Sequence, residues 1–474
     1  MQSYKKAIFA PIKLIIMTNK YHSVKPITGT GEKRLFIETY GCQMNVNDSE
    51  VVLSILQPAG YALCESYKDA DLILINTCSI RDNAEQRIWG RLDLFRLEKM
   101  KRKGLKVGIL GCMAERLKDE LLSHTAVDLV AGPDSYRSLP FLLESLDSGS
   151  KQINTLLSQE ETYADISPVR MDKNGVSSFI SIMRGCNNMC SYCVVPYVRG
   201  GERSRDPRSI EREARELFEN GYKEVTLLGQ NVDSYHWINP DNPTEVTTFS
   251  LLLEMIALIN PALRVRFSTS HPKDMSDSVL YTMAMYPNIC KHIHLPVQSG
   301  SDAMLLKMNR KYTRAEYLGR VAKIREIMPD CSISTDIIAG FSGESEEDHL
   351  DTLSVMREVG YYTAFMFQYS ERPNTKAARR YPDDVPAEVK GRRLDEVIKL
   401  QKELSLANNK ADLGKEFEVL VEGFSKKSKA ELTGRTQQNK VVVFPAGDHK
   451  TGDYVWVKVE SCTSATLIGK EITR

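Results

Sequence analysis

Cys186-Asn187-Asn188-Met189-Cys190-Ser191-Tyr192-Cys193 is the stretch of sequence that decides the fold. Its three cysteines have the spacing C-x3-C-x2-C, and a strand-length apolar run, Phe179–Met183, comes directly before them. Thiolates are the usual ligands of iron-sulfur clusters, and a four-iron cluster ordinarily binds four of them. Three cysteines therefore leave one iron open to bind a further molecule.

Two other uses of closely spaced cysteines fit this stretch less well. Structural zinc sites favour four ligands arranged in C-x2-4-C pairs, and ferredoxin sequences use C-x2-C-x2-C. The spacing instead resembles that of the radical S-adenosylmethionine (SAM) superfamily, in which the open iron chelates the amino and carboxylate groups of the cofactor. Tyr192, just before the third cysteine, also fits that motif.

Strand-length apolar runs recur after the triplet and alternate with helix-like stretches. Together with the first run they are Phe179–Met183, Val225–Gly229, Arg264–Ser268, His292–Pro296, Ser332–Ile338 and Phe365–Tyr369. Ser209 is expected to cap the first helix, which Gly221 closes. Six such units predict a central, partial (β/α)6 TIM-like barrel over residues 172–404, with its active site at the carboxyl ends of the strands.

Residues 33–149 repeat a simpler pattern, in which an apolar run and a turn lead to a cysteine and then to a helix-like stretch. The runs Leu35–Ile37, Leu72–Ile75 and Val107–Leu110 precede Cys42, Cys78 and Cys112. This alternation predicts an N-terminal parallel α/β domain, whose ligand sites lie beyond the carboxyl ends of the strands. Lone cysteines are often small packing residues. The shared position after a strand favours convergence of these three on a second 4Fe-4S cluster.

The remaining cysteines and a histidine pair carry weaker signals. Cys64, Cys290, Cys331 and Cys462 have no partner at ligand spacing and are interpreted as packing residues. His292 and His294 share one face of a strand, but without further ligands they are interpreted as polar residues of the barrel. Ten cysteines in a long chain without an export signal indicate thiols kept reduced in the cytoplasm.

The C-terminal part of the chain changes to strand-like alternation. Residues 417–421, 440–444 and 454–459 predict a small antiparallel β-barrel within 405–472. Basic side chains gather in and beside its first hairpin, namely Lys426, Lys427, Lys429, Arg435 and Lys440. They are candidate RNA contacts, although a lysine-rich turn can also be simply solvated. The charge pattern alone does not choose between these interpretations.

The rest of the sequence sets limits on the kind of protein. Residues 1–32 are expected to be a disordered extension, because the apolar run at 7–17 is interrupted by Lys13 and too short to span a bilayer. Residues 150–171 are expected to be a linker. The formal net charge is only +1, from 63 basic and 62 acidic residues, so any nucleic-acid contact must be local.

From about residue 33 onward, the order of these parts resembles the methylthiotransferases, a family of radical SAM enzymes. Four motifs resemble the transfer RNA branch of that family: Arg184-Gly185-Cys186, Gly229-Gln230-Asn231-Val232, Ser270-His271-Pro272-Lys273-Asp274 and Pro296-Val297-Gln298-Ser299-Gly300-Ser301. Two residues depart from the family pattern. Ser342 stands where relatives often have proline, and Asp233 stands where asparagine is common.

The resemblance implies two 4Fe-4S clusters, held by Cys42, Cys78 and Cys112 and by Cys186, Cys190 and Cys193, with S-adenosyl-L-methionine as the further cofactor. It implies cofactor contacts for Tyr192, Gly229, Gln230, Ser268, Gln298 and Asp336, and an RNA-binding TRAM domain at the C-terminus. The implied reaction is methylthiolation of C2 of N6-isopentenyladenosine beside the anticodon. The implied partners are the anticodon stem-loop of tRNA and a flavodoxin- or ferredoxin-type electron donor, with no membrane.

Other functions remain open at this point. Two branches of the family act on a ribosomal protein aspartate or on threonylcarbamoyl-adenosine in tRNA. A protein of a different class, a non-catalytic iron-sulfur redox sensor that binds RNA, would leave the C-x3-C-x2-C spacing unexplained. A radical mechanism needs no proton-abstracting residue, so no general base is predicted.

Overall fold

The computed structural model describes residues 33–79, 82–171 and 175–473. The prediction for residues 1–32 therefore lies outside the described residues. The chain divides into two compact units, Met1–Leu156 and Leu157–Arg474, and each is described by itself. In the described parts of the chain, no helix is long and apolar enough to cross a membrane.

The first unit is a six-stranded sheet in which every neighbouring pair is parallel, in the order β2-β1-β3-β4-β5-β6. Its strands are β1 (Lys33–Thr39), β2 (Tyr61–Leu63), β3 (Leu72–Thr77), β4 (Lys106–Gly111), β5 (Leu129–Ala131) and β6 (Gln152–Asn154). Its helices are α1 (Gln43–Leu56), α2 (Asp82–Lys101), α3 (Cys112–Ser123) and α4 (Leu139–Ser145). β3 is buried along its whole length, as expected for a strand covered on both faces. The predicted parallel α/β domain is confirmed.

The start of the predicted linker differs from the prediction. Residues 152–154 form β6, which pairs with β5 at the edge of the sheet. A three-residue edge strand with one face in solvent carries almost no periodic signal, so composition alone made this segment resemble a linker.

The second unit contains six parallel strands in two groups of three, β13-β10-β7 and β14-β15-β16. The strands are β7 (Ser177–Ser181), β10 (Glu224–Leu228), β13 (Arg264–Ser268), β14 (His292–His294), β15 (Ser332–Ala339) and β16 (Thr363–Gln368). Backbone hydrogen bonds from Val265 to Asn288 and from Cys290 to Val265, both 2.9 Å, join the two groups. The predicted partial barrel is confirmed.

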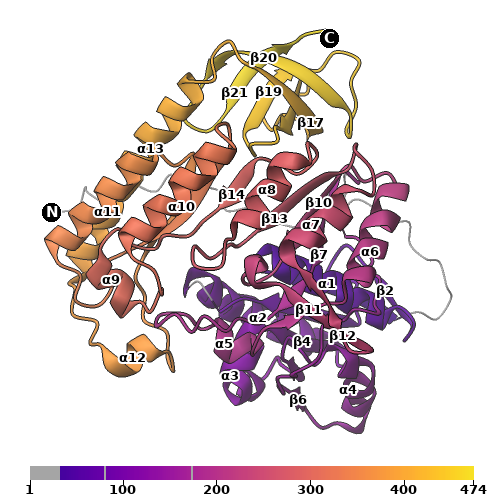
Figure 1. The fold of residues 1–474 in the computed structure, drawn as a ribbon. Coiled ribbons are helices and arrows are strands. Elements are labelled where there is room, and N and C mark those ends of the chain that lie inside the picture. Colours follow the sequence, from indigo (N-terminus) through magenta and orange to yellow (C-terminus); the bar gives the residue numbers. More distant parts are fainter. Residues whose placement is uncertain (1–32, 80–81, 172–174, 474) are drawn as a thin grey trace, which may run out of the picture. The chain divides into compact units, whose positions relative to one another are not determined.

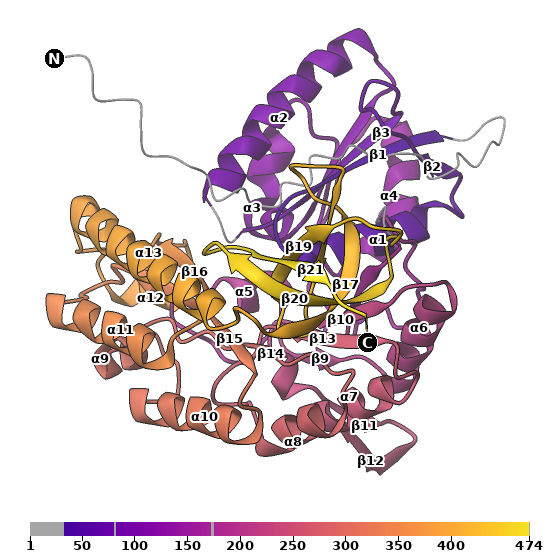
Figure 2. The same ribbon diagram turned by 90° about the horizontal axis from the view of Figure 1, so that it is seen from above.

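Helices surround the strands of this unit in an arc that Figure 2 shows from above. They are α6 (Pro207–Glu219), α7 (Phe249–Ala257), α8 (Asp277–Met285), α10 (Arg314–Ile327), α11 (Glu346–Val359) and α13 (Ala387–Lys410). One large apolar core lies between the helices and the strands. The cap of α6 differs from the prediction, because the Asp206 side chain accepts a hydrogen bond from the Arg208 amide. Ser209 is buried in the first turn and donates instead to the Asp206 carbonyl oxygen, at 2.7 Å.

Shorter elements complete the second unit around the barrel. Two hairpins are formed by β8 (Met183–Arg184) with β9 (Arg203–Ser204) and by β11 (His236–Asn239) with β12 (Asn242–Thr248). Short helices are α5 (Val195–Arg199), α9 (Asp302–Lys307) and α12 (Lys376–Arg380).

The chain ends in a closed five-stranded barrel with the order β17-β18-β19-β21-β20. Its strands are β17 (Glu416–Phe424), β18 (Glu431–Arg435), β19 (Val441–Pro445), β20 (Tyr454–Cys462) and β21 (Leu467–Glu471). The predicted barrel is confirmed, with one difference: β19 and β21 pair in parallel. A closed ring with an odd number of strands cannot alternate direction throughout, so one parallel pair is required.

This small barrel is joined to the amino-terminal ends of the large barrel's strands (Figure 1). Arg264, at the start of β13, binds Glu418 at 3.0 Å, and Arg266 donates to the Thr436 carbonyl oxygen at 2.7 Å. The Tyr454 hydroxyl donates to the Ala262 carbonyl oxygen at 2.9 Å. Buried charged and polar contacts of this kind fix the small barrel at the end of the strands opposite to their carboxyl ends.

Candidate functional site

The three cysteines of the first unit follow three neighbouring strands. Cys42 precedes α1, Cys78 comes directly after β3, and Cys112 is the first residue of α3. The Tyr40 amide donates to the Asn76 carbonyl oxygen at 2.9 Å, and the Thr77 hydroxyl donates to the Leu110 carbonyl oxygen at 2.6 Å. The three cysteine-bearing loops therefore lie side by side at the carboxyl edge of the sheet.

Glycines allow these loops to approach one another closely. Gly41 has a φ of +118°, and a Cβ atom there would overlap the Cβ atom of Cys78 and lie 3.1 Å from its sulfur. Gly111 has a φ of +88°, and its Cβ atom would lie 2.6 Å from the Thr77 carbonyl oxygen. The glycines that precede Cys42 and Cys112 thus leave room for both cysteines beside the loop of Cys78.

Two buried asparagines hold this arrangement. Asn76 donates from its side-chain amide to the Asn45 carbonyl oxygen at 2.9 Å and to the Ser49 hydroxyl at 3.0 Å. Asn45 donates from its own amide to the Tyr40 carbonyl oxygen at 2.8 Å. Sequence reasoning gave neither asparagine a role, because nothing local distinguishes a loop-bridging amide from an ordinary turn residue.

The second cysteine triplet lies in a loop of the second unit, after β8. The Cys186 amide donates to the Gly200 carbonyl oxygen at 3.1 Å, and the Cys193 amide donates to the Cys190 carbonyl oxygen at 3.0 Å. Burial, with smaller contributions from the charges of Glu202 and Cys190, raises the pKa of Cys186 to about 11. Burial raises the pKa of Cys193 to about 12, with charge on Cys190 and Cys186 adding to the effect. Burial is the main cause of both shifts.

The donor set of each triplet fits an iron-sulfur cluster. Both sets consist of soft thiol ligands, and burial disfavours the thiolate form in the second set unless cations bind it. In the part of the chain that the structure describes, no three such side chains meet closely enough to share one metal ion. A four-iron cluster does not require this, because each cysteine binds a different iron.

The predicted cofactor residues lie in the loop of the second triplet and in, or just after, the barrel strands. Gln230 accepts a hydrogen bond on Oε1 from the Gly185 amide at 2.5 Å, beside Cys186. Gly229 precedes it, and a Cβ atom there would lie 2.5 Å from Cγ of Met183. Ser268 is the last residue of β13, and Tyr192 packs edge-on against Phe341, with ring centroids 6.5 Å apart.

Gln298 and Asp336 are joined through their backbones. The Gln298 amide donates to the Asp336 carbonyl oxygen at 2.9 Å, and Gln298 adopts a φ of +70°. His294, the last residue of β14, lies 3.4 Å from the Asp336 carboxylate and shares the Ser334 hydroxyl with His292. Both histidines therefore bond to polar neighbours inside the barrel, as the sequence predicted.

The loop of Ser270–Asp274 also reaches the cysteine triplet. Lys273 donates to the side-chain oxygen of Asn188 at 3.0 Å, and the Asn231 amide donates to Asp274 at 2.7 Å. These contacts connect the loops after β10 and β13 to the cysteine loop. The sequence analysis singled out the motifs at 229–232 and 270–274, but it did not predict that they hold the cysteine loop.

Asp233 lies beneath this loop and departs from the family pattern. Its Oδ2 accepts a hydrogen bond from the His271 amide at 3.2 Å. Burial raises the pKa of Asp233 from 3.8 to about 7, and hydrogen bonds from Ser270 and His271 oppose part of that rise. Since the folded chain then holds a proton that the unfolded chain has lost, the free energy of unfolding falls as the pH rises from about 4 to about 7.

Asparagine at this position should remove that pH dependence. We expect Asp233→Asn to unfold like the wild type near pH 4 and to be more stable above pH 7, by up to roughly 4 kcal/mol. Thermal unfolding of both proteins at pH 5 and pH 8 measures the effect. An equal difference in melting temperature at the two pH values would contradict it.

The five basic residues predicted to bind RNA are not equivalent. Lys426, Lys427 and Lys429 are exposed in the loop between β17 and β18. Lys440 is buried and forms an ion pair with Asp412, so its ammonium group is already bound within the protein. Arg435 pairs with Glu422 at 3.1 Å. The prediction for Lys440 is corrected accordingly, because its partner, 28 residues earlier in the chain, gave no local signal.

Arg310 is a site residue that sequence reasoning missed. Its Nη1 donates to the sulfur of Cys190 at 3.3 Å and to the Tyr192 hydroxyl at 3.4 Å. It lies 117 positions after Cys193 in a segment without a motif, so only the fold shows that the two belong together.

Comparison with known families matches three segments of the chain. Residues 34–132 match the family described as Uncharacterized protein family UPF0004, residues 180–356 match the Radical SAM superfamily, and residues 410–471 match the TRAM domain. A radical SAM methyltransferase, TsrM, from Kitasatospora setae has a similar fold, with a TM-score of 0.56 and 14% identity over 73% of this chain and 77% of that one. Together with the C-x3-C-x2-C loop, these findings define a radical SAM enzyme.

Curated relatives make the assignment narrower. The chain is 58% identical over 449 residues to the tRNA-2-methylthio-N(6)-dimethylallyladenosine synthase of Phocaeicola vulgatus, covering 94% of this chain and 98% of the relative. It is 59% identical over 452 residues to the enzyme of the same name from Amoebophilus asiaticus, covering 93% of each. The chain belongs to this family of methylthiotransferases, which use SAM and two 4Fe-4S clusters.

Proposed function

We propose that this transferase adds a methylthio group to C2 of N6-isopentenyladenosine next to the anticodon of tRNA. The observation that carries the proposal is the presence of two cysteine triplets, each at the carboxyl ends of parallel strands, in a chain that also carries a TRAM barrel. Relatives that match almost the whole chain are named for that reaction.

The six cysteines would hold the two clusters. Cys42, Cys78 and Cys112 would bind one, and Cys186, Cys190 and Cys193 would bind the other. When bound, the clusters and SAM supply the one-electron chemistry, the methyl group and the sulfur. The protein's own residues hold these groups in place and shield them, and the proposal assigns no general base.

The proposed SAM site surrounds the second triplet. Tyr192, Gly229, Gln230, Ser268, Gln298 and Asp336 would position the cofactor. Two bonds support this role, because the bond from Gly185 to Gln230 fixes the loop after β10 to the cysteine loop, and the bond from Gln298 to Asp336 fixes the loop after β14 to β15. Met183 occupies the space that a side chain at position 229 would need. Because Gly229 has no side chain, its loop can lie close to the barrel.

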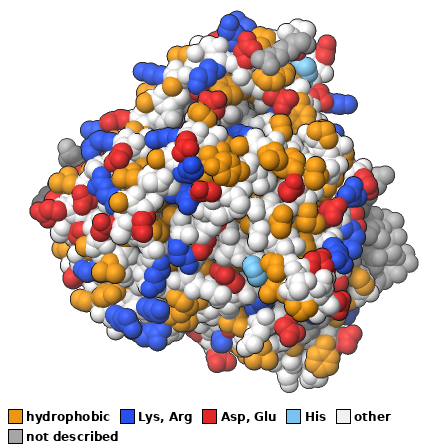
Figure 3. Space-filling view, in the orientation of Figure 1, with side chains coloured by type: hydrophobic (Ala, Val, Ile, Leu, Met, Phe, Trp, Pro, Cys, Tyr) orange, Lys and Arg blue, Asp and Glu red, His pale blue; other side chains and the backbone are white. Residues whose placement is uncertain are grey.

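The anticodon stem-loop would bind with its adenine unstacked, which costs less in a loop than in a duplex. Figure 3 shows Lys and Arg side chains interspersed with Asp and Glu on the visible face, as the small net charge requires. Phosphate contacts must then come from local groups such as Lys426, Lys427 and Lys429. A flavodoxin- or ferredoxin-type protein in the cytoplasm would supply the electrons.

Replacing Lys426, Lys427 and Lys429 by alanine should weaken tRNA binding and reduce its salt dependence. If all three contact phosphates, the slope of log K against log salt concentration falls in magnitude by about 2 to 3. Filter binding at several salt concentrations measures this slope. Alanines at the exposed Lys399, Lys402 and Lys410 of α13 remove the same charge and serve as the control. Equal slopes for the two variants would contradict the assignment.

An anaerobic assay tests the reaction itself. The reconstituted protein is mixed with SAM, reductant and prenylated tRNA, and the nucleosides are then digested and weighed. A gain of one methylthio group on the prenylated adenosine supports the proposal. Cleavage of SAM without a nucleoside product would favour a protein aspartate or threonylcarbamoyl-adenosine as the substrate. Intact clusters without any cleavage would favour a redox sensor.

A further inference from the structure

Arg310 is a buried cation whose nitrogens all have partners within the protein. The residue is only 4% exposed. Besides its bonds to Cys190 and Tyr192, it donates from Nε to the Tyr312 hydroxyl at 2.9 Å and from Nη2 to the Pro296 carbonyl oxygen at 2.8 Å. Because these bonds engage the whole guanidinium group, it is fixed in orientation and faces the cysteine sulfur.

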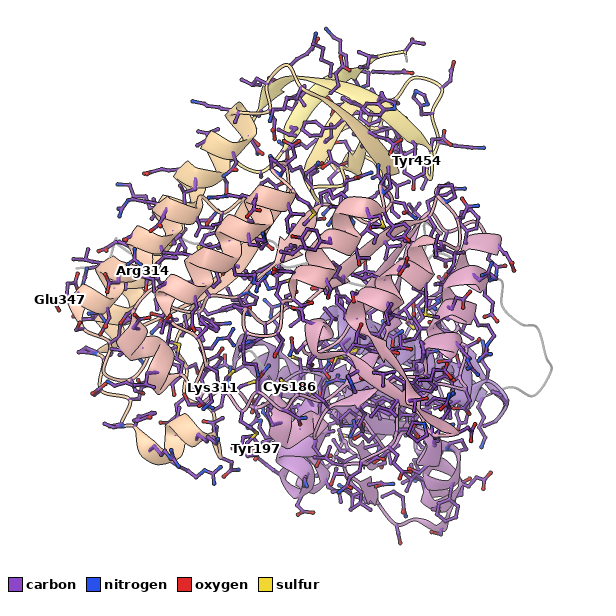
Figure 4. All side chains as sticks on the ribbon, in the orientation of Figure 1. Cys186, Tyr197, Lys311, Arg314, Glu347 and Tyr454 are labelled. Carbon is purple, nitrogen blue, oxygen red and sulfur yellow. The ribbon has the colours of Figure 1, made fainter. Side chains whose placement is uncertain are left out.

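Three hydrogen bonds to backbone carbonyl groups, two of them donated by side chains, set the distance between Arg310 and the cysteine loop. The Ser191 amide donates to the Met308 carbonyl oxygen at 2.9 Å, and the Ser191 hydroxyl donates to the Lys307 carbonyl oxygen at 2.8 Å. The Asn309 amide donates to the Met189 carbonyl oxygen at 2.9 Å. These three bonds join the segment after α9 directly to the residues on both sides of Cys190. Figure 4 labels Lys311 and Cys186 on these two segments.

Among the residues that the structure describes, no carboxylate pairs with the charge of Arg310. Several other buried arginines of this unit pair with acids, as Arg266 does with Glu224 and Arg393 does with Glu344. Over the described residues, no ion pair joins Arg310 to an aspartate or a glutamate, and its other partners are hydroxyl and carbonyl groups. Burying a cation without an opposite charge is costly. The group that faces this cation is the sulfur of Cys190, one of the proposed cluster ligands.

We propose that Arg310 is the fixed counter-cation of the iron-sulfur cluster held by Cys186, Cys190 and Cys193, and that it sets the reduction potential of that cluster. Reduction adds one electron from a one-electron donor and raises the negative charge facing Arg310. Since the guanidinium stays protonated, no proton moves with the electron. The reduced form gains more from the cation than the oxidised form does, so Arg310 raises the potential. The proposal rests on the proposed ligands of this cluster.

Redox titration of the reconstituted enzyme, followed by electron paramagnetic resonance, tests this role. Arg310→Gln removes the charge and keeps a hydrogen-bond donor. At the wild-type midpoint, we expect a reduced-to-oxidised ratio about tenfold lower, which for one electron is a shift of about 59 mV to lower potential. Lys311→Gln removes a neighbouring but exposed charge and should leave the midpoint unchanged.

Each outcome decides the question. An unchanged midpoint in Arg310→Gln with full iron content overturns the proposal. If that variant binds no iron at the second triplet, Arg310→Lys decides: recovery of the iron supports a counter-cation, and equal loss assigns Arg310 to the architecture of the loop. An iron content that does not change when Cys186 is replaced by alanine in the otherwise wild-type protein would instead overturn the proposed ligands.

Discussion

Alanine in place of Cys186 should abolish both SAM cleavage and tRNA modification, whereas alanine in place of Cys78 should abolish the modification alone. The two residues belong to separate compact units, so losing one triplet leaves the other unit folded. We expect each lost activity to fall at least about a thousandfold, or roughly 4 kcal/mol in activation free energy. Mass spectrometry of 5′-deoxyadenosine and of the digested nucleosides measures both activities in one sample.

Cys64→Ala is the matched control for these variants. Cys64 follows β2 in the first unit, and its thiol donates to the Ser66 carbonyl oxygen at 3.5 Å, away from the three predicted ligands. This variant should keep its iron and both activities, whereas Cys186→Ala and Cys78→Ala should each lose about half of the iron. The assignment of the first triplet would be contradicted if Cys78→Ala kept a modification activity at least tenfold above the limit set by the expected thousandfold fall.

Long, strongly patterned elements could be predicted from the sequence, and short ones could not. The run at 264–268 matches β13 residue for residue, and the run at 332–338 falls one residue short of β15. β2, β5 and β6 were missed, because three residues alone cannot show a period of two against their surroundings. β14 is equally short, but the apolar run predicted for it, 292–296, is longer than the strand. The helix cap at Asp206 was missed because Ser209 offered an equally good side chain three residues later.

The candidate site also contains features that the sequence predicts and features that it does not. The placement of Cys42, Cys78 and Cys112 beside one another follows from the rule that parallel strands share one carboxyl edge. The burial of Lys440 against Asp412 and the contact of Arg310 with Cys190 join residues that are distant in sequence. A charge in a sequence shows neither how deeply it is buried nor which group it pairs with, so Lys440 was counted among the candidate RNA contacts and Arg310 was overlooked.

Alanine in place of Gly41 should empty the first triplet without touching any cysteine. The new Cβ atom would overlap the Cβ atom of Cys78, and neither atom can move away, because both are attached directly to backbone. Relief requires the Cys42 and Cys78 loops to separate, which moves two of the proposed ligands. We therefore expect the loss of about half of the iron and a fall in tRNA modification of at least about a hundredfold, or roughly 2.7 kcal/mol. SAM cleavage should persist.

Gly60→Ala separates this steric effect from the cost of backbone conformation. Gly60 lies in the same unit with a φ of +83°, and nothing lies within 4 Å of where its Cβ atom would be. Alanine there has the cost of a positive φ, about 1 kcal/mol, without a clash. Iron content, melting temperature and modification rate are compared for both variants. If Gly41→Ala matched Gly60→Ala in all three, the close approach of Gly41 to Cys78 would have no part in holding the cluster, and the first triplet would need another geometry.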